Sequence, residues 1–466
     1  MKKFLIYTAV TFAISTSANA INYIHNVKGS FDKEKVQQQV SHAGGQLLDC
    51  LPQIGICQVS FESNEQALKS GLTLSPDASA FIPNIETGLT DEQRELTLES
   101  FNNPPYSGDD DFYFDLQWGH DAVNAVESWN AGHRGAGVVV AVLDSGADAT
   151  HPDLAPNINT QLSTSFVAGE AWYDTYGTFN HGSHTAGTIA AADNGYGVIG
   201  VAPEAELIIL KVLSAQTGSG SSYGTMAGIV YAADNGADVI NMSLGLSIRK
   251  NGLYDIAGTP YDTSDDIRFA VGGEDGIAAF INSYQKAVDY AVKKGVTIIA
   301  SAGNDSVISN ASDSLVHLPS DLPKVLSISA TTPYNWAKDP TNTYLDNRAS
   351  YSNYGSKSIS FAAPGGSVDA AGLPGGFDIC QAGVVQHYCF VFDLVFSTSG
   401  TGSWYWSAGT SMAAPHAAGV AALIIGKNGG DMDPVHVEKA MRDYADDLGK
   451  PGHDHTYGAG RVVAPQ

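Results

Sequence analysis

The chain has 466 residues, of which 43% are apolar, 16% are charged and 50 are glycine. Such a chain can bury a large core and lacks the composition of a disordered segment. Its 49 acidic and 24 basic residues give a net charge of −25, which excludes a nucleic-acid-binding role because that role depends on a basic surface.

The N-terminus has the three parts of a secretory signal peptide, so we expect residues 1–20 to be removed. Lys2 and Lys3 precede an apolar stretch at 4–14, which is too short to span a bilayer, and Ala-Asn-Ala at 18–20 is a small-residue cleavage site. No later stretch is long and apolar enough to cross a membrane. We therefore expect a secreted, extracellular protein without a membrane span, with the periplasm as the alternative location.

Residues 21 to about 85 have the pattern of a small α+β unit with a ferredoxin-like order of elements. The pattern predicts strands at 22–27, 46–50, 57–61 and 81–83, and helices at 31–42 and 62–70. The stretch 86–112 is acidic, polar and aperiodic, so we expect an exposed linker that is open to proteolysis.

The four cysteines fall into two local pairs, Cys50 with Cys57 and Cys380 with Cys389. Four cysteines allow three pairings, and we expect the two local disulfides because each closes a short loop within one segment. A metal site is the alternative, but neither pair has the spacing of a zinc knuckle. Disulfides fit a chain that leaves the cytoplasm.

From about residue 113 the pattern becomes that of a larger α/β unit. Continuous apolar and β-branched runs are typical of strands buried on both faces, and they occur at 137–143, 207–212, 239–242, 296–301 and 325–330. Helical runs occur at 184–192, 223–235, 282–294 and 413–425. The alternation predicts a doubly wound, mostly parallel sheet, in which active residues gather at the carboxyl ends of the strands.

Three residues of the types found in nucleophilic triads stand at strand ends or helix starts. Asp144 ends the first buried strand, where a turn aspartate is the alternative. His181 lies at the start of a helix, where a surface or packing histidine is the alternative. Ser411 opens a buried helix, where an ordinary N-cap serine is the alternative. A Ser-His-Asp system needs a base beside the hydroxyl and an acid that fixes the imidazole tautomer.

Two further strand ends carry candidate site residues. Asn304 follows a buried strand in the sequence Ser-Ala-Gly-Asn, and a side-chain amide there would donate to a developing oxyanion. A turn asparagine is the alternative. The stretch 240–245 ends in Ser-Leu-Gly, whose small residues suit an extended peptide lying against it.

Together these motifs resemble the subtilisin-like serine proteases, the subtilases. The matching motifs are Asp-Ser-Gly at 144–146, His-Gly-Ser-His-Thr-Ala-Gly at 181–187, Ser-Leu-Gly at 243–245, Ala-Gly-Asn at 302–304 and Gly-Thr-Ser-Met-Ala-Ala-Pro-His at 409–416. They follow the family's Asp, His, Ser order, and the resemblance covers roughly 113–466. It implies a subtilisin-like fold and a serine endopeptidase that works through an acyl-enzyme intermediate.

The resemblance also implies roles for individual residues. Ser411 would be the nucleophile, His181 the general base and then acid, Asp144 the orienting carboxylate and Asn304 the oxyanion donor, while His184 would be structural. The residues expected to bind an extended peptide substrate are Gly218, Ser219, Gly220, Ser243, Leu244, Gly245, Ala302 and Gly303.

The same resemblance implies a precursor organisation. Residues 1–20 would be the signal peptide, 21–112 a propeptide with its acidic linker, and 113–466 the catalytic domain. The propeptide would assist folding and inhibit the site until it is cleaved away, and the mature chain would begin between about 100 and 115. The expected partners are protein or peptide substrates and the propeptide itself, and we expect a monomer.

A structural calcium site, Ca²⁺, is implied as well. Its ligands would be the side chains of Asp153 and Asn194, the carbonyl oxygens of Ala192, Tyr196 and Val198, and an N-terminal side chain, Asp115 or Gln117. A Gly-Asn turn without metal is the alternative.

Two stretches are longer than the family core, 247–281 and 366–406, and they either rim the substrate cleft or are peripheral additions. Asp305 either biases the first substrate pocket towards polar or basic side chains or lies in solvent. Two other functions stay open, a catalytically silent binding protein on a protease fold and an esterase. An esterase would normally show Gly-x-Ser-x-Gly and the order Ser, Asp, His, and neither is seen.

Overall fold

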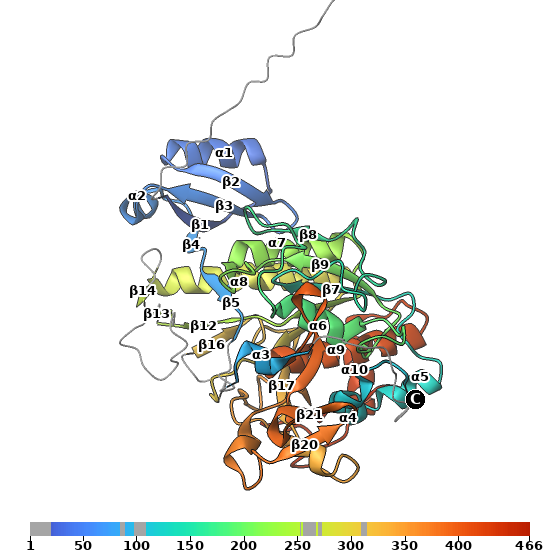
Figure 1. Ribbon diagram of the computed structural model, residues 1–466. Coiled ribbons are helices and arrows are strands. Elements are labelled where there is room, and N and C mark those ends of the chain that lie inside the picture. The colour runs from blue at the N-terminus through green and yellow to red at the C-terminus, as the bar shows by residue number, and fades with distance from the viewer. Residues whose placement is uncertain are drawn as a thin grey trace, which may run out of the picture.

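A computed structural model of the chain describes residues 20–83, 89–96, 109–251, 253–254, 267–268, 273–308 and 315–466. It contains a small N-terminal unit, residues 20–76, and a large unit that begins near residue 109 (Figure 1). The predicted signal peptide, apart from Ala20, lies outside the described residues.

The small unit follows the β-α-β-β-α-β order expected from the sequence. Its elements are β1 (Ile21–Asn26), α1 (Lys33–His42), β2 (Gln46–Leu51), β3 (Ile56–Phe61), α2 (Asn64–Lys69) and β4 (Leu74–Pro76). The strands form an antiparallel sheet in the order β2-β3-β1-β4. Asp32 begins α1 as its N-cap by accepting the Lys35 N–H at 3.1 Å. The Cys50–Cys57 disulfide joins the paired strands β2 and β3.

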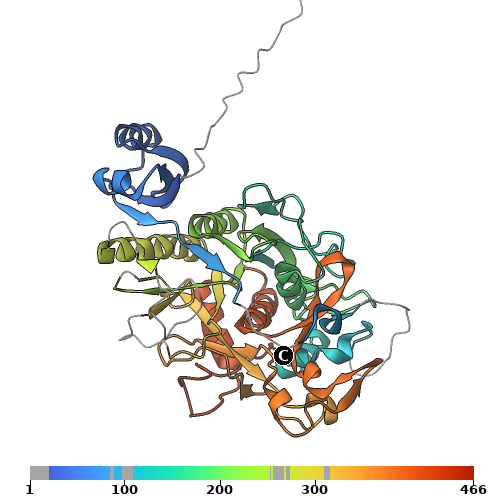
Figure 2. The same cartoon turned by 60° about the vertical axis from the view of Figure 1, so that its left-hand side comes forward.

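The expected last strand of this unit, at 81–83, belongs elsewhere. Strand β4 takes its place in the small sheet, and the chain then leaves the unit as β5 (Ser79–Phe81). Strand β5 pairs antiparallel with β10 (Ser219–Ser221) of the large unit, and Figure 2 shows it running down onto that unit. The pairing partner of residues 79–81 is thus non-local, and no local pattern reports it.

The large unit is built on an eight-stranded sheet in the order β18-β17-β15-β11-β7-β9-β8, with β19 also paired to β17. Its strands are β7 (Val139–Asp144), β8 (Thr164–Ser165), β9 (Glu206–Lys211), β11 (Val239–Met242), β15 (Thr297–Ser301), β17 (Val325–Thr332), β18 (Asn347–Arg348) and β19 (Phe361–Pro364). Every pairing except β17 with β18 is parallel. The doubly wound, mostly parallel α/β sheet predicted from the sequence is confirmed.

Helices cover both faces of this sheet. One face packs against α6 (His181–Ala190), α9 (Thr410–Lys427) and α10 (Pro434–Tyr444), and the other against α7 (Ser222–Asp234) and α8 (Gly273–Lys293). Along β7, Val140 and Val142 enter the first cluster, whereas Ala141 and Leu143 enter the second. This alternation explains the continuous apolar runs, because both faces of each central strand are buried.

Shorter elements surround the sheet. They are α3 (Asp91–Arg94), β6 (Glu95–Leu96), α4 (Trp118–Ala122), α5 (Ala125–Asn130), β12 (Leu246–Arg249), β13 (Leu253–Tyr254), β14 (Ile267–Arg268), β16 (Leu315–Leu318), β20 (Ile379–Ala382), β21 (Val385–Tyr388), β22 (Val395–Thr398) and β23 (Trp404–Ser407). The stretch 247–281 contributes strands beside β16 and the start of α8. The stretch 366–406 contains the Cys380–Cys389 disulfide and packs its aromatic side chains in a cluster shared with residues 112–122 and Trp336.

The stretch 86–112 differs from the exposed linker that its composition indicates. Where the structure describes it, at 89–96 and 109–112, it packs on the large unit. Strand β6 pairs with β23, and Asp111 and Phe112 are buried. An acidic segment can pack on a folded unit where backbone N–H groups of that unit donate to its carboxylates. Composition alone therefore does not distinguish a packed acidic segment from an exposed linker.

The small unit rests on α7 and α8 through the open face of its sheet (Figure 1). Ile24 and Ile56 join the apolar cluster formed with these helices. Asp77 accepts the N–H of Tyr223 at 2.9 Å in the first turn of α7, where a carboxylate also interacts favourably with the helix dipole.

Candidate active site

Asp144 and His181 form a buried hydrogen-bonded pair at the carboxyl end of the sheet. Asp144 ends β7 and is 0% exposed, and His181 is the first residue of α6, which Asn180 caps. The Nδ1 atom of His181 donates to the two carboxylate oxygens of Asp144 at 2.8 and 2.9 Å. A carboxylate can only accept, so this contact fixes the proton of a neutral imidazole on Nδ1 and leaves Nε2 as an acceptor.

Close packing of the α6 start on the turn after β7 makes this contact possible. A Cβ on Gly182 would lie 2.1 Å from the carbonyl oxygen of Gly146, so a side chain at that position would push the helix away. The Thr185 hydroxyl donates to Asp144 at 3.3 Å and the Ser145 N–H donates at 2.6 Å, which gives the carboxylate three kinds of donor.

Ser411 reaches the same strand end from the opposite direction. It is the second residue of α9, so its backbone N–H lies in the first turn, where the helix offers no acceptor. Its Oγ lies 3.3 Å from the carbonyl oxygen of Ser243, whose own hydroxyl donates to the Ser411 carbonyl at 2.8 Å. Because β7 and β11 are neighbours with Leu143 beside Met242, Ser243 follows directly beside Asp144. Two adjacent strand ends therefore carry Asp144, with its partner His181, and Ser243, with its partner Ser411, at one edge of the sheet.

Two polar atoms at this site have no hydrogen-bond partner among the described residues, Nε2 of His181 and Nδ2 of Asn304. Both are buried, and an unsatisfied buried polar atom is uncommon and costly. The Asn304 oxygen accepts from the Thr410 N–H at 3.0 Å and from its hydroxyl at 2.8 Å, which turns the amide NH₂ away from Thr410. The site thus holds a vacant acceptor on His181 and a vacant donor on Asn304.

Sequence reasoning missed Thr410 and Asn353, which hold in place the segment 302–304 that ends in the candidate oxyanion donor Asn304. The Thr410 hydroxyl accepts the Gly303 N–H at 3.1 Å, and Asn353 donates to the Ala302 carbonyl at 2.9 Å. Thr410 stands next to Ser411 in its motif, which was an available signal. Asn353 lies in a loop with no local signal, because its role depends on a contact between distant segments.

The predicted peptide-binding residues lie on both sides of β5. Gly218 accepts the Ile82 N–H at 2.9 Å, and Ser219 and Gly220 belong to β10, the partner of β5. Gly245 exchanges two backbone hydrogen bonds with Phe81, at 2.9 and 3.1 Å. The other predicted residues, Ser243, Leu244, Ala302 and Gly303, are buried at the ends of β11 and β15. The Asp305 carboxylate accepts from Asn353 at 3.3 Å.

The residues predicted to bind calcium gather only in part. The Asp153 carboxylate accepts the Val198 N–H at 3.0 Å, the Trp404 indole N–H at 2.8 Å and the Asn194 amide at 3.4 Å, and burial raises the pKa of Asp153 to about 7. Ala192 and Tyr196 lie in the same loop, but the Tyr196 N–H points to Asp111, at 3.0 Å. Around Asp153 the structure therefore offers mainly N–H donors, which a cation does not bind.

The two candidates for the N-terminal ligand, Asp115 and Gln117, both line a pocket that also includes Asp121 and Gly383. Gln117 uses its side chain on Ile199, donating to the carbonyl at 2.9 Å and accepting the N–H at 3.1 Å.

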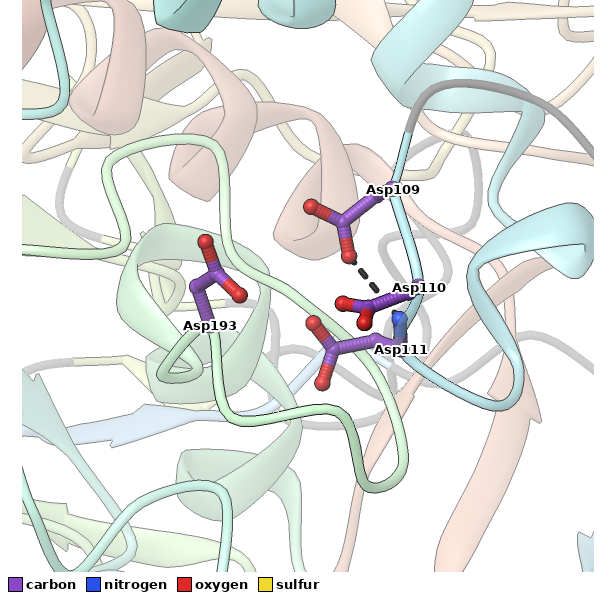
Figure 3. A group of neighbouring side chains, drawn as sticks. All are labelled: Asp109, Asp110, Asp111 and Asp193. Carbon is purple, nitrogen blue, oxygen red and sulfur yellow. Dashed lines mark hydrogen bonds between the residues drawn. The ribbon is translucent and has the colours of Figure 1, made fainter. Parts of the chain in front are cut away.

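Four carboxylates beside the same loop form an acidic cluster, Asp109, Asp110, Asp111 and Asp193 (Figure 3). Each offers an oxygen within 4.8 Å of the others. Asp111 is 2% exposed, its Oδ2 has no hydrogen-bond partner among the described residues, and burial followed by the neighbouring Asp109 raises its pKa to about 8. Hard oxygens in this number are the ligands that calcium prefers, so these residues also fit a divalent cation.

The residues that the structure describes include no helix long and apolar enough to cross a membrane.

Comparison with known proteins agrees with the fold. Residues 135–460 match the model of the subtilase family, Peptidase S8. The chain is 32% identical to subtilisin NAT of Bacillus subtilis subsp. natto, over 81% of this chain and 79% of that protein. It is 34% identical to M-protease of Shouchella clausii (strain KSM-K16), over 75% of this chain and 69% of that protein.

Solved structures share the fold over nearly the whole chain. The epidermin leader peptide processing serine protease of Staphylococcus aureus superposes with a TM-score of 0.70 at 19% identity, covering 95% of this chain and 96% of that one. Fervidolysin from Fervidobacterium pennivorans superposes with a TM-score of 0.64 at 24% identity, covering 95% of this chain and 60% of that one. By the family match and these relatives, the chain is a subtilisin-like serine endopeptidase and belongs to the subtilase family.

Proposed function

We propose that the chain cleaves peptide bonds through Ser411, His181 and Asp144. Nε2 of His181 takes the proton of the Ser411 hydroxyl as Oγ attacks the carbonyl carbon of the substrate. The same nitrogen then gives that proton to the departing amine, which leaves Ser411 acylated. A water molecule, deprotonated by Nε2, hydrolyses the ester and restores the serine. Asp144 holds the Nδ1 proton throughout and stabilises the imidazolium.

The oxyanion formed in each attack would receive the Asn304 Nδ2–H and the N–H of Ser411. Nδ2 of Asn304 has no hydrogen-bond partner among the described residues. The Ser411 N–H lies in the first turn of α9, where the helix supplies no acceptor, so both donors are available to the oxyanion. Donors that are fixed before the reaction cost no reorganisation when the charge develops, so they favour the transition state over the substrate.

The observation that carries this proposal is the arrangement of His181. Its Nδ1 is fixed by Asp144 while its Nε2 stays unsatisfied, and helix α6, which His181 begins, packs against helix α9, which carries Ser411. Hydrolysis of a peptide p-nitroanilide by the mature enzyme tests it. Ser411→Ala should remove hydrolysis while leaving the fold intact, and full activity in this variant would refute the assignment.

We also propose that the chain is a secreted, self-inhibited precursor that acts as a monomer. The signal peptide would be residues 1–20, the inhibitory propeptide 21–112 and the catalytic domain 113–466. Strand β5 supports the inhibitory role because it adds to β10 and reaches Gly245, the residues expected to bind an extended substrate. With Phe81 opposite Gly245, the antiparallel register brings Pro83 opposite Ser243, which contacts Ser411.

A second contact supports the same role on the other side of the site. Residues 89–96 lie against β23, where Asp91 accepts from the Tyr405 hydroxyl at 2.8 Å and the Arg94 guanidinium lies 4.9 Å from the centre of the Tyr405 ring. Phe179 packs on Tyr405 at 4.6 Å and lies 6.3 Å from the ring of His181. The propeptide would therefore contact the catalytic domain in two places, at β10 and at β23.

In the precursor, before residues 21–112 are removed, calcium would be held by the acidic cluster Asp109, Asp110, Asp111 and Asp193, beside the loop that the family resemblance indicates. The buried Oδ2 of Asp111 and the mutual repulsion of the four carboxylates support this placement. When bound, calcium would neutralise the cluster and tie the segment before the catalytic domain to the Asp193 loop.

A further inference from the structure

His317 lies between the two backbone segments that are expected to line the first substrate pocket. A Cβ built on Gly245 would lie 2.4 Å from Nε2 of His317, and one built on Gly303 would lie 2.9 Å from the same atom. Gly245 ends the Ser-Leu-Gly segment and Gly303 lies in the Ala-Gly-Asn segment. One edge of the imidazole therefore reaches both walls at once.

The backbone around His317 holds the ring in this place. His317 belongs to β16 and lies opposite Ser247 of the antiparallel strand β12. Its N–H donates to the Asp321 carboxylate at 2.9 Å, and the Asp321 N–H donates to the His317 carbonyl at 2.8 Å. The imidazole Nδ1 lies 3.0 Å from the Ser247 hydroxyl, which fixes the ring orientation.

The other ring nitrogen has no assigned task. His317 is 7% exposed, and its Nε2 has no hydrogen-bond partner among the described residues. A buried imidazole nitrogen without a partner costs free energy, and the proposed hydrolysis does not use this one. Depending on how Ser247 and Nδ1 share their proton, Nε2 donates or accepts, so it can pair with an oxygen-bearing side chain in either state.

The residue that follows strand β5 by two positions, Pro83, agrees with a shortened pocket. If the antiparallel pairing of Phe81 with Gly245 continues, Pro83 lies opposite Ser243, whose hydroxyl donates to the Ser411 carbonyl. Because the side chain of proline is short, it would make few contacts in a deep pocket. The imidazole of His317 at the inner end of the pocket would fill the space that a proline side chain does not reach.

We propose that His317 closes the inner end of the pocket for the residue before the scissile bond, and that it selects short side chains carrying an oxygen. Asparagine, aspartate and serine would fit, with their oxygen or amide meeting Nε2. Phenylalanine, tyrosine and leucine would meet the ring and leave Nε2 unsatisfied. This inference rests on the proposed function, because it describes the substrate that the Ser411 site accepts.

The test compares tetrapeptide p-nitroanilides that differ only in the residue before the scissile bond, assayed with wild type, His317→Leu, His317→Gly and His436→Leu. His317→Leu keeps the bulk of the ring and removes its polarity, whereas His317→Gly removes both. His436 is an exposed histidine on α10 and provides a matched control.

We expect wild type to have at least a tenfold higher kcat/KM for asparagine than for phenylalanine. His317→Leu should abolish that preference, and His317→Gly should raise kcat/KM for phenylalanine at least tenfold, with His436→Leu unchanged. A wild-type preference for phenylalanine that neither His317 variant alters would overturn the inference while leaving the proposed function standing. Hydrolysis of no peptide by wild type would instead overturn the proposed function.

Discussion

Replacing Asp144 with asparagine should lower kcat by about four orders of magnitude without unfolding the protein. Asparagine keeps an oxygen for the Ser145 N–H but turns an NH₂ group towards Nδ1 of His181, so the imidazole proton moves to Nε2. His181 would then offer a proton where it must accept one. At 2.8 Å, Coulomb's law with an effective dielectric constant of about 20 gives about 6 kcal/mol for the lost carboxylate–imidazolium attraction. That energy corresponds to about four orders of magnitude in rate, the size known from other triads.

The assay is steady-state hydrolysis of a peptide p-nitroanilide by matured enzyme, supplied with the wild-type propeptide in trans if the variant does not process itself. Asp148→Asn is the matched control, since Asp148 is equally an internal carboxylate near β7 but bonds to Thr150 and Gly402 and not to the imidazole. Its kcat should stay within tenfold of wild type. If Asp144→Asn also stays within tenfold, Asp144 does not set the tautomer of His181 and the reasoning is refuted.

Four further outcomes are expected. Asn304→Leu should lower kcat by a factor of about 10²–10³ with KM little changed, because a hydrogen-bond donor to the transition state is lost. A kcat equal to that of wild type would show that Asn304 does not donate to the oxyanion. Asp91→Ala combined with Arg94→Ala should shorten the delay before secreted precursor becomes active, measured by a continuous assay, since both contacts to β23 are lost; an unchanged delay contradicts an inhibitory role for the contact at β23. Chelator should destabilise the wild-type precursor more than the Asp111→Asn precursor, because bound calcium stabilises the folded state by about 4 kcal/mol at a calcium concentration about 1,000 times Kd; equal decreases in the thermal midpoint of the two precursors would place calcium elsewhere. Burial, and next the charge of His181, lowers the pKa of His184 to about 3. Between pH 6.5 and about pH 3, His184 is therefore protonated in the unfolded chain but neutral in the folded chain. As the pH is lowered through this window, this side chain should decrease the free energy of unfolding by about 1.4 kcal/mol per pH unit. Urea titrations of His184→Gln should show a smaller decrease, and a slope identical to that of wild type would contradict the lowered pKa of His184.

The central sheet and the candidate triad are predictable from the sequence because their signals are local. Strands buried on both faces have continuous apolar runs, and parallel strands end at one edge, so the runs at 137–143 and 296–301 predict Asp144 and Asn304 at the same edge. The helix expected at 413–425 extends to Thr410–Lys427, and its first turn carries Ser411. The two disulfides are predictable because each closes a short loop.

Features that depend on contacts between distant segments are not predictable in this way. Strand β5 resembles the last strand of the small sheet in composition, but its partners are β10 and Gly245, more than a hundred residues away. The acidic stretch before the catalytic domain has the composition of a linker, whereas in the folded chain Asp111 accepts N–H groups from the Asn194 loop. His317 has no motif of its own, and its position follows from the β12–β16 pairing.

The most direct test of the account is to map the adduct of a fluorophosphonate probe on the matured enzyme by peptide mass spectrometry. Such probes phosphonylate an activated serine, and activation depends on a base that can accept its proton. We predict one modified residue, Ser411, in wild type, and no adduct in His181→Ala. Labelling of a different serine, or equal labelling of Ser411 without His181, would contradict the Ser411–His181–Asp144 assignment.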